Sequence, residues 1–415
     1  MRRLNWPSRA LTLFATCLFV VPLFGHAQSS SWNTWLTTQI EQHPDIVAAR
    51  EQWIGANASA DAAEQAIYNP ELSAELERNG NEDNYRVGVE QTIDWWDKRG
   101  AKRQQASHLR TAAEELYRQQ VLDKTAEALD ALLEWHFANR AAVIAQAQQQ
   151  QLNTLFELVE KRQQAGDLST IDAELTFLSL SQQLLQVAEV DVALQKAQIR
   201  VRELLPEWSI ERGGIPDDFW PSQLDSVTDQ ELLKHPAVAS AYDNWQSFKE
   251  EAKVAKRAAK AEPTVGVNAG RDGEENVVGL TFSIPLNVRN NFNAESRAAE
   301  SKALEAEARF QALFRKQRFD WQAAHSTWEL YAKQYRRWQA VAQDRVENSA
   351  QLLERQWRSG DLSTSNYLLA LNQRAESLLA GIQLEKQTQH ALTEVLQQSG
   401  RLNTATIPAT SSTNQ

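Results

Sequence analysis

The chain has 415 residues, of which 42% are hydrophobic, enough for a sizeable core. Its formal net charge of −11 argues against nucleic acid and against an anionic membrane surface as partners. A mean hydropathy of −0.53 is too polar for a bundle of transmembrane helices, and the scarcity of glycine (15) and proline (11) favours long helices.

Residues 1–27 have the features of a secretory signal peptide. Two arginines near the start precede an apolar run at 10–24, and the small residues at 25–27 suit a signal peptidase. An N-terminal membrane anchor is the alternative, but the run is short for a membrane span. We expect cleavage after Ala27, which removes the only cysteine and the only methionine, so the exported chain must be held together by packing alone.

Four phrases from the first half of the chain recur in the second half, in the same order and at nearly constant spacing. One example is Gly-Asp-Leu-Ser-Thr, which occurs in both halves. The paired phrases begin at His43 and His235, Asn69 and Glu262, Val87 and Val278, and Ala165 and Ser359. This pattern predicts an internal duplication, in which one structural unit occurs twice.

Each copy is predicted to contain a helix, a β-hairpin, a very long helix and a return helix. Apolar and polar residues alternate in the hairpins, and apolar residues step by three and four in the helices, as in coiled coils. The first copy spans 28–205, with the hairpin at 71–94, the long helix at 97–165 and the return helix at 168–205. The second spans 230–398, with the hairpin at 263–285, the long helix at 293–358 and the return helix at 362–398. A linker is expected at 206–229 and a flexible tail at 399–415.

The hairpins are predicted to form part of a membrane barrel. One face of each strand is apolar, and aromatic residues occur where strands meet helices, as at a membrane interface. Four strands cannot close a barrel and open edges are not tolerated in lipid, so the chain must oligomerise, and three copies would give twelve strands. The polar residues predicted to face the lumen are Glu75, Glu77, Arg86, Glu90 and Asn268. The alternative is a soluble protein in which the hairpins cap a helical bundle.

These features together resemble the TolC-like outer-membrane efflux channel family, over the chain up to about residue 398. The resemblance rests on the duplicated element order, on the Gly-x-x-Ser turns at 166–169 and 360–363, and on the phrases at 89–99 and 283–291 where strands meet helices. The second of these phrases is closest to the heavy-metal (cobalt-zinc-cadmium) efflux branch.

The resemblance implies a homotrimer in the outer membrane that extends into the periplasm. Its fold would be mainly α with β-hairpins: long antiparallel α-helical hairpins form a periplasmic α-barrel, and four strands per chain contribute to a twelve-stranded transmembrane β-barrel. It implies docking to a periplasmic adaptor (membrane fusion protein) and to an inner-membrane pump of the resistance-nodulation-division type. The docking tips would be Gly166, Asp167, Leu168, Ser169, Gly360, Asp361, Leu362 and Ser363.

Members of the family often carry a carboxylate six residues after the tip glycine, facing the pore. Asp172 matches that position in the first copy, whereas the second copy has Asn366, which puts an acidic ring built from both copies in doubt. Asp172, Glu174 and Asn366 are the candidates for a pore constriction, and a solvated helix face is the alternative for all three.

No catalytic constellation, phosphate loop, cofactor-binding motif or metal signature is found in the sequence. His43 and His235 precede prolines at equivalent positions and are interpreted as helix-start residues, because no ligand cluster surrounds them. The resemblance therefore implies a passive exit duct without enzymatic activity or cofactor, which carries heavy-metal cations in particular. The alternatives are a periplasmic coiled-coil adaptor or scaffold, and the same channel serving organic drugs or type I protein secretion.

Overall fold

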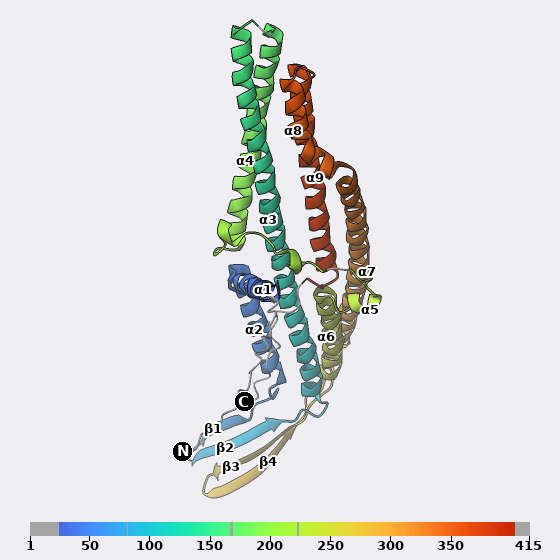
Figure 1. Ribbon diagram of the computed structural model, residues 1–415. Coiled ribbons are helices and arrows are strands. Elements are labelled where there is room, and N and C mark those ends of the chain that lie inside the picture. Colours follow the sequence, from blue (N-terminus) through green and yellow to red (C-terminus); the bar gives the residue numbers. More distant parts are fainter. Residues whose placement is uncertain (1–24, 81, 167–168, 222–223, 403–415) are drawn as a thin grey trace, which may run out of the picture.

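The computed structural model describes residues 25–80, 82–166, 169–221 and 224–402. Within them the molecule is long and narrow, with helices along most of its length and a sheet at one end (Figure 1). The first half contains α1 (Gly25–Gln42), α2 (Pro44–Glu64), β1 (Glu71–Asn79), β2 (Glu82–Thr92), α3 (Lys98–Gln164) and α4 (Thr170–Leu204). The connecting segment contains short helical turns at Ile210–Arg212 and Asp217–Phe219, followed by α5 (Asp229–Leu232). The second half contains α6 (Pro236–Ala258), β3 (Thr264–Asp272), β4 (Glu275–Ser283), α7 (Asn293–Trp338), η3 (Gln339–Gln343), α8 (Asp344–Arg358) and α9 (Thr364–Gln398).

The helix starts follow from local chemistry. His43 precedes α2 as its cap, and its Nδ1 accepts a hydrogen bond from the backbone N–H of Asp45. Asp97 stands before α3 in a left-handed conformation, φ 56°, and its carboxylate accepts from the N–H of Gly100. Phe292 takes the same conformation before α7, φ 54°. Both strand-to-helix connections therefore have one left-handed residue immediately before the helix.

The two long helices differ in one respect. Helix α3 is continuous over 67 residues, which at 1.5 Å per residue is about 100 Å. The helix expected at 293–358 is instead interrupted by a π-helical segment at Gln339–Gln343. Just before it, the ring of Trp338 lies against Gly381 of α9, where an added Cβ would lie 2.2 Å from the ring. The absence of a side chain at Gly381 thus leaves room for the ring of Trp338.

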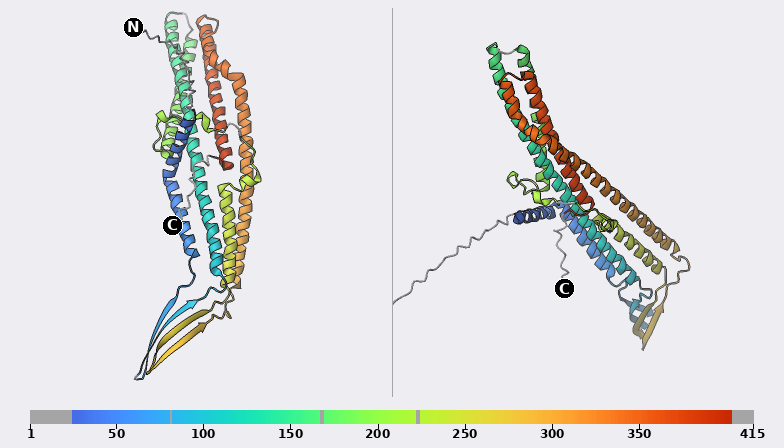
Figure 2. Two further views of the ribbon diagram at one scale, coloured as in Figure 1. Left: turned by 60° about the horizontal axis from the view of Figure 1, so that its bottom comes forward. Right: turned by 45° about the vertical axis from the view of Figure 1, so that its right-hand side comes forward.

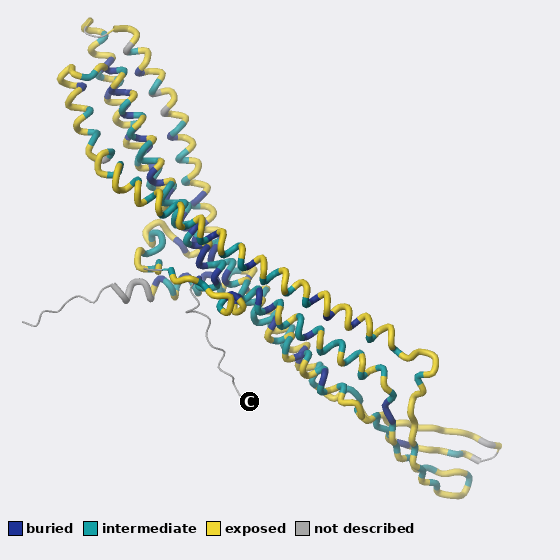
Figure 3. The backbone as a smooth tube through the Cα atoms, turned by 90° about the vertical axis from the view of Figure 1, so that its right-hand side faces the viewer, coloured by how far each residue is buried: buried dark blue, intermediate teal, exposed yellow. Residues whose placement is uncertain are grey.

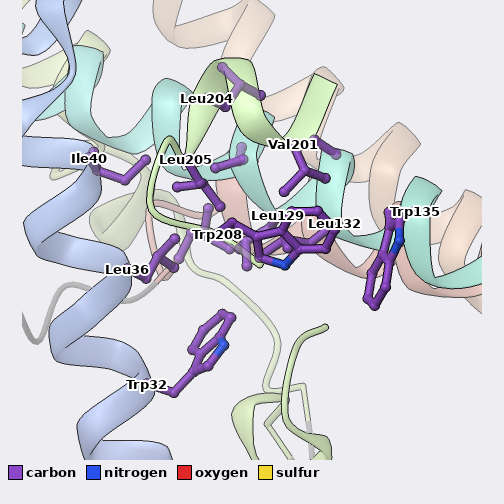
Figure 4. Packing of buried hydrophobic residues seen from close by; sticks show 14 of the residues in the cluster. Trp32, Leu36, Ile40, Leu129, Leu132, Trp135, Val201, Leu204, Leu205 and Trp208 are labelled. Atoms are coloured by element: carbon purple, nitrogen blue, oxygen red, sulfur yellow. The ribbon is translucent and has the colours of Figure 1, made fainter. Parts of the chain in front are cut away.

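The main hydrophobic core lies near the middle of the molecule, where α1, α3 and the end of α4 meet the connecting segment (Figure 4). Helix α1, which the sequence did not lead us to expect, buries Trp32, Leu36 and Ile40 there. The first three residues of α1 fall within the predicted signal peptide, and the remainder of that prediction lies outside the described residues.

The chain after α9 corrects a second expectation. Residues 399–402 were expected to belong to a flexible tail, but Leu402 is buried in the central core and its N–H donates to the carbonyl oxygen of Leu396. Residues 403–415 lie outside the described part. None of the helices in the described ranges contains an apolar stretch sufficient to cross a lipid bilayer.

Candidate functional site: the two-faced sheet and the helix tips

The four strands form one antiparallel sheet in the order β1-β2-β3-β4, so β1 and β4 lie at its edges (Figure 2). Rows of apolar residues cross the whole sheet. One row contains Leu72, Val89, Val267 and Leu280, and another contains Ala74, Val87, Ala269 and Val278. Leu72 is 76% exposed and Leu280 86% exposed, so this apolar face is uncovered (Figure 3). A sheet of a soluble domain would bury such a face.

The opposite face is polar and includes the five residues predicted to face a lumen: Glu75, Glu77, Arg86, Glu90 and Asn268. The structure places all five on this face. The guanidinium Nη1 of Arg86 lies 3.9 Å from Oε2 of Glu75 on the neighbouring strand. The amide of Asn268 donates to Oγ1 of Thr281, 3.0 Å away.

Glycines are concentrated on the same polar face, a feature that the sequence analysis missed. Gly266 lies beside Glu90 and Gly279 beside Asn268. An added Cβ would lie 2.7 Å from Cγ of Glu90 at the first position and 2.6 Å from Oδ1 of Asn268 at the second. These glycines leave room for the polar side chains of the neighbouring strand. The sequence does contain a signal for these glycines, because glycine alternates with valine, alanine or leucine along the strands.

A buried ion pair joins the two halves where the sheet meets the helices. Nζ of Lys98, the first residue of α3, lies 2.9 Å from Oε2 of Glu262, which precedes β3. The two side chains are only 12% and 4% exposed, and the hydroxyl of Tyr68 donates to the same carboxylate. Burial acts to lower the pKa of Lys98, but its hydrogen bonds to Glu262 and Tyr68 outweigh that effect and raise the pKa.

Helix α4 has one flank packed on α3 and another that is exposed. The exposed flank carries a row of apolar residues spaced by seven, which we call the α4 stripe: Ile171, Leu178, Leu185, Val192 and Ile199. Their exposed fractions lie between 52% and 72%. A heptad row of this kind is the seam by which one helix packs along another.

The helix tips end in glycines of left-handed conformation, Gly166 with φ +78° and Gly360 with φ +84°. Ser363 caps α9, because its Oγ accepts from the N–H of Asn366. The carboxylate of Asp361 accepts a hydrogen bond from Oγ of Ser359, the residue that follows α8.

The remaining tip and constriction candidates are described only in part. Asp167 and Leu168 lie outside the described residues, and Ser169 immediately precedes α4. Leu362 is partly buried and packs against the hydrophobic cluster around Trp357 and Tyr367. Asp172 lies in the first turn of α4. The side chains of Glu174 and Asn366 are exposed.

A second small core ties the two tips together. The indole of Trp357, 4% exposed, stacks on the ring of Tyr367 with centroids 5.1 Å apart. Its N–H donates to Oγ1 of Thr364, and the guanidinium of Arg162 lies over its ring at 5.3 Å. Leu155 of α3 is buried in the same cluster. The end of α3 therefore supports the tip formed by α8 and α9.

Both histidines that precede a proline lie at helix starts. His43 caps α2, and His235 precedes α6 with its Nε2 3.2 Å from the carbonyl oxygen of Gln397. Burial lowers the pKa of His235. Over the described ranges, no group of three or more His, Cys, Asp or Glu side chains is placed to hold a metal ion.

Comparison with known proteins agrees with this geometry. Residues 35–206 match the family model described as outer membrane efflux protein. The outer-membrane channel OprN has 17% sequence identity and a TM-score of 0.74, covering 90% of this chain and 91% of OprN. The chain has the fold of an outer-membrane efflux channel.

Two further solved structures share this channel fold. CusC, described in work on folding and transmembrane channel formation, has 15% identity and a TM-score of 0.74, covering 89% of this chain and 92% of CusC. The outer membrane protein VceC from Vibrio cholerae has 14% identity and a TM-score of 0.73, covering 90% of this chain and 97% of VceC. No curated protein matches the sequence.

Proposed function

We propose that the chain is one subunit of an outer-membrane efflux channel, a passive exit duct for substrates delivered by an inner-membrane pump and a periplasmic adaptor. The observation that carries this proposal is the sheet with one uncovered apolar face and one uncovered polar face. Lipid on the apolar side and a water-filled lumen on the polar side satisfy both faces at once. Strands of nine to eleven residues have the length that a tilted membrane strand requires.

We infer a homotrimer from the exposed edges. In this sheet β1 and β4 each have one unpaired edge, and pairing β1 of one copy with β4 of the next would give a closed ring. Three copies would form a twelve-stranded β-barrel, and the α4 stripe of each copy would pack against the α7–α8 flank of its neighbour. The recurrent order of helix, two strands and two long helices supports an internal duplication as the origin of this arrangement.

Disruption of the α4 stripe tests the assembly. We expect the wild-type chain in the outer-membrane fraction as a trimer that resists SDS until heated. Leu185→Glu combined with Val192→Glu should abolish that trimer, whereas Leu109→Glu, at an exposed site on α3 outside the stripe, should retain it. Recovery of the wild-type chain as a soluble periplasmic protein would refute the channel and favour the adaptor or scaffold.

The tips at Gly166 and Gly360 are proposed to dock the adaptor, and Asp172 with Glu174 to form a cation-favouring constriction. The exposed left-handed turns and the three-fold repetition of the carboxylates support these roles. In planar bilayers, Asp172→Asn with Glu174→Gln should lower the cation selectivity of the open channel. Unchanged selectivity would assign these carboxylates to a solvated helix face.

The cargo is proposed to be heavy-metal cations. The excess of acidic residues favours cations in the lumen, and the absence of a metal-holding cluster in the described residues suits conduction without coordination. A deletion strain should become more sensitive to zinc, cobalt and cadmium. Increased sensitivity to organic toxins alone would refute the metal cargo while leaving the channel itself intact.

A further inference from the structure

We propose that the junction between sheet and helices binds the headgroups of anionic phospholipids through three basic side chains, Lys256, Lys260 and Arg289, which we call the basic collar. The inference rests on the proposed function, in which the sheet crosses the outer membrane. It also modifies the expectation from net charge, because an acidic chain can carry a basic surface at the one level where headgroups lie.

Contacts at the end of α6 hold Trp96 and the segment after β4 beside the part of the chain that carries Lys256 and Lys260. Trp96 donates its indole N–H to the carbonyl oxygen of Ala261, 2.8 Å away, and Nζ of Lys260 lies 4.2 Å from the centroid of the Trp96 ring. On the other side, the amide of Asn287 donates to the carbonyl oxygen of Ala259, also 2.8 Å away. Arg289 follows Asn287 by two residues, in the segment after β4 that this hydrogen bond ties to the end of α6.

Large exposed apolar side chains occur in the same connecting segments as Trp96 and Arg289. Trp95 is 68% exposed, Leu286 77% and Val288 85%. They follow β2 and β4, whose apolar residues form the uncovered face of the sheet. Passing from the sheet to the helices, an exposed apolar surface therefore changes into a basic one. A lipid leaflet has the same order, with apolar tails next to phosphate headgroups.

The local charge contrasts with that of the whole chain. Residues 98–103 contain four basic and no acidic side chains, and residues 253–260 likewise contain four and none, in a chain of net charge −11. Basic residues at the C-terminal end of α6 stabilise that helix, but those at the N-terminal end of α3 face the positive end of its dipole and destabilise it. Helix stability thus accounts for basic residues at the end of α6 but not for those at the start of α3.

The collar side chains are available for a ligand. Lys256 and Arg289 are exposed and form no ion pair with any described residue, and Lys260 is engaged only by the Trp96 ring. Lys98 is not part of the collar, because Glu262 holds its ammonium group in the buried pair. A phosphodiester anion would supply the missing counter-charge, and its acyl chains would cover Trp95 and Leu286.

The test compares two lipids of equal chain length, dioleoyl-phosphatidylglycerol and dioleoyl-phosphatidylcholine. The full chain, purified in neutral detergent, is titrated with each lipid, and the bound lipids are counted by native mass spectrometry. The collar variant is Lys256→Gln, Lys260→Gln and Arg289→Gln together. The matched control, Lys234→Gln, Arg315→Gln and Lys333→Gln, removes the same charge from exposed positions away from the junction.

We expect wild type and control to prefer phosphatidylglycerol, and the collar variant to bind it at least about tenfold more weakly, with phosphatidylcholine unaffected. Added salt should weaken the preference in the wild type. Equal phosphatidylglycerol binding by wild type and collar variant would overturn the proposal, as would competition by millimolar inorganic phosphate, which would indicate a soluble anion. Failure of the wild type to enter vesicles of either lipid would instead refute the proposed membrane function.

Discussion

Replacing His390 with glutamine should destabilise the pairing of α3 and α9 in a pH-dependent manner. Nδ1 of His390 lies 2.7 Å from Oδ1 of Asp130, and Nε2 lies 3.3 Å from Oε1 of Glu134. Nζ of Lys386, one turn earlier on α9, lies 2.6 Å from the other oxygen of Glu134. Two cations of α9 thus meet two carboxylates of α3.

The size of the expected destabilisation follows from the pKa of His390. Burial acts to lower it, but hydrogen bonds to Asp130 and Glu134 outweigh burial and raise the pKa to about 9 from 6.5. A shift of this size corresponds to about 3 kcal/mol in favour of the folded state. Because Asp130 and Glu134 are nearly half exposed, screening by water reduces the expected contribution to about 1–2 kcal/mol.

The direction of the pKa shift determines the pH range in which His390 stabilises the folded state. A raised pKa means that the folded state binds the proton more tightly, so the contribution is fully present below pH 6.5 and is lost as the pH rises through about 9. The same contacts, with the hydrogen bond from His390 first, lower the pKa of Glu134 to about 2, so stability is also lost as the pH falls from 4.5 through about 2. The two shifts describe one set of contacts and are not added.

The assay is thermal unfolding of the full chain in neutral detergent, followed by circular dichroism of the helices from pH 6 to pH 10. The melting temperature of His390→Gln should lie below that of the wild type at pH 6, and the difference should shrink towards zero at pH 10. A matched control is His325→Gln, because His325 is only 3.9 Å from one exposed carboxylate on its own helix. A difference that is equal at pH 6 and pH 10 would refute the reasoning.

Three further substitutions test other contacts in the same assay. Gly381→Leu should lower the free energy of unfolding by about 1–3 kcal/mol, since the new side chain overlaps the ring of Trp338. Gly55→Leu should lower it much less, because nothing lies within 4 Å of an added Cβ there. Equal losses of stability in the two variants would contradict the close contact at Gly381. Trp357→Ala should cost about 3–5 kcal/mol and increase proteolysis at the tips, so unaltered protease resistance would argue against a shared tip core. Lys98→Met should lower the free energy of unfolding by about 3–5 kcal/mol, because it leaves the buried carboxylate of Glu262 unpaired. Adding Glu262→Leu should restore part of this loss. A larger loss in the double variant would contradict the buried pair.

Much of the architecture could be predicted because helices and strands give local periodic patterns of apolar and polar residues. Alternation of period two placed Glu75 and Arg86 on one face of the sheet. Steps of three and four predicted long helices with apolar faces, and Leu155 of α3 is buried. The long helices were predicted to end at residues 165 and 358, and the glycines that follow, Gly166 and Gly360, both take the left-handed conformation. Backbone geometry repeats along the chain, so a single sequence carries this information.

Only the tertiary structure decided which distant residues meet. Nothing local shows that Lys98 pairs with Glu262, that Gly279 lies beside Asn268, or that Trp338 lies against Gly381. These contacts depend on strand register and on how far one helix slides along another, which are set by packing over the whole assembly. The sequence by itself determined the periodic elements and their order, whereas the fold decided the pairs of side chains, because a pair joins segments whose relative position no local pattern encodes.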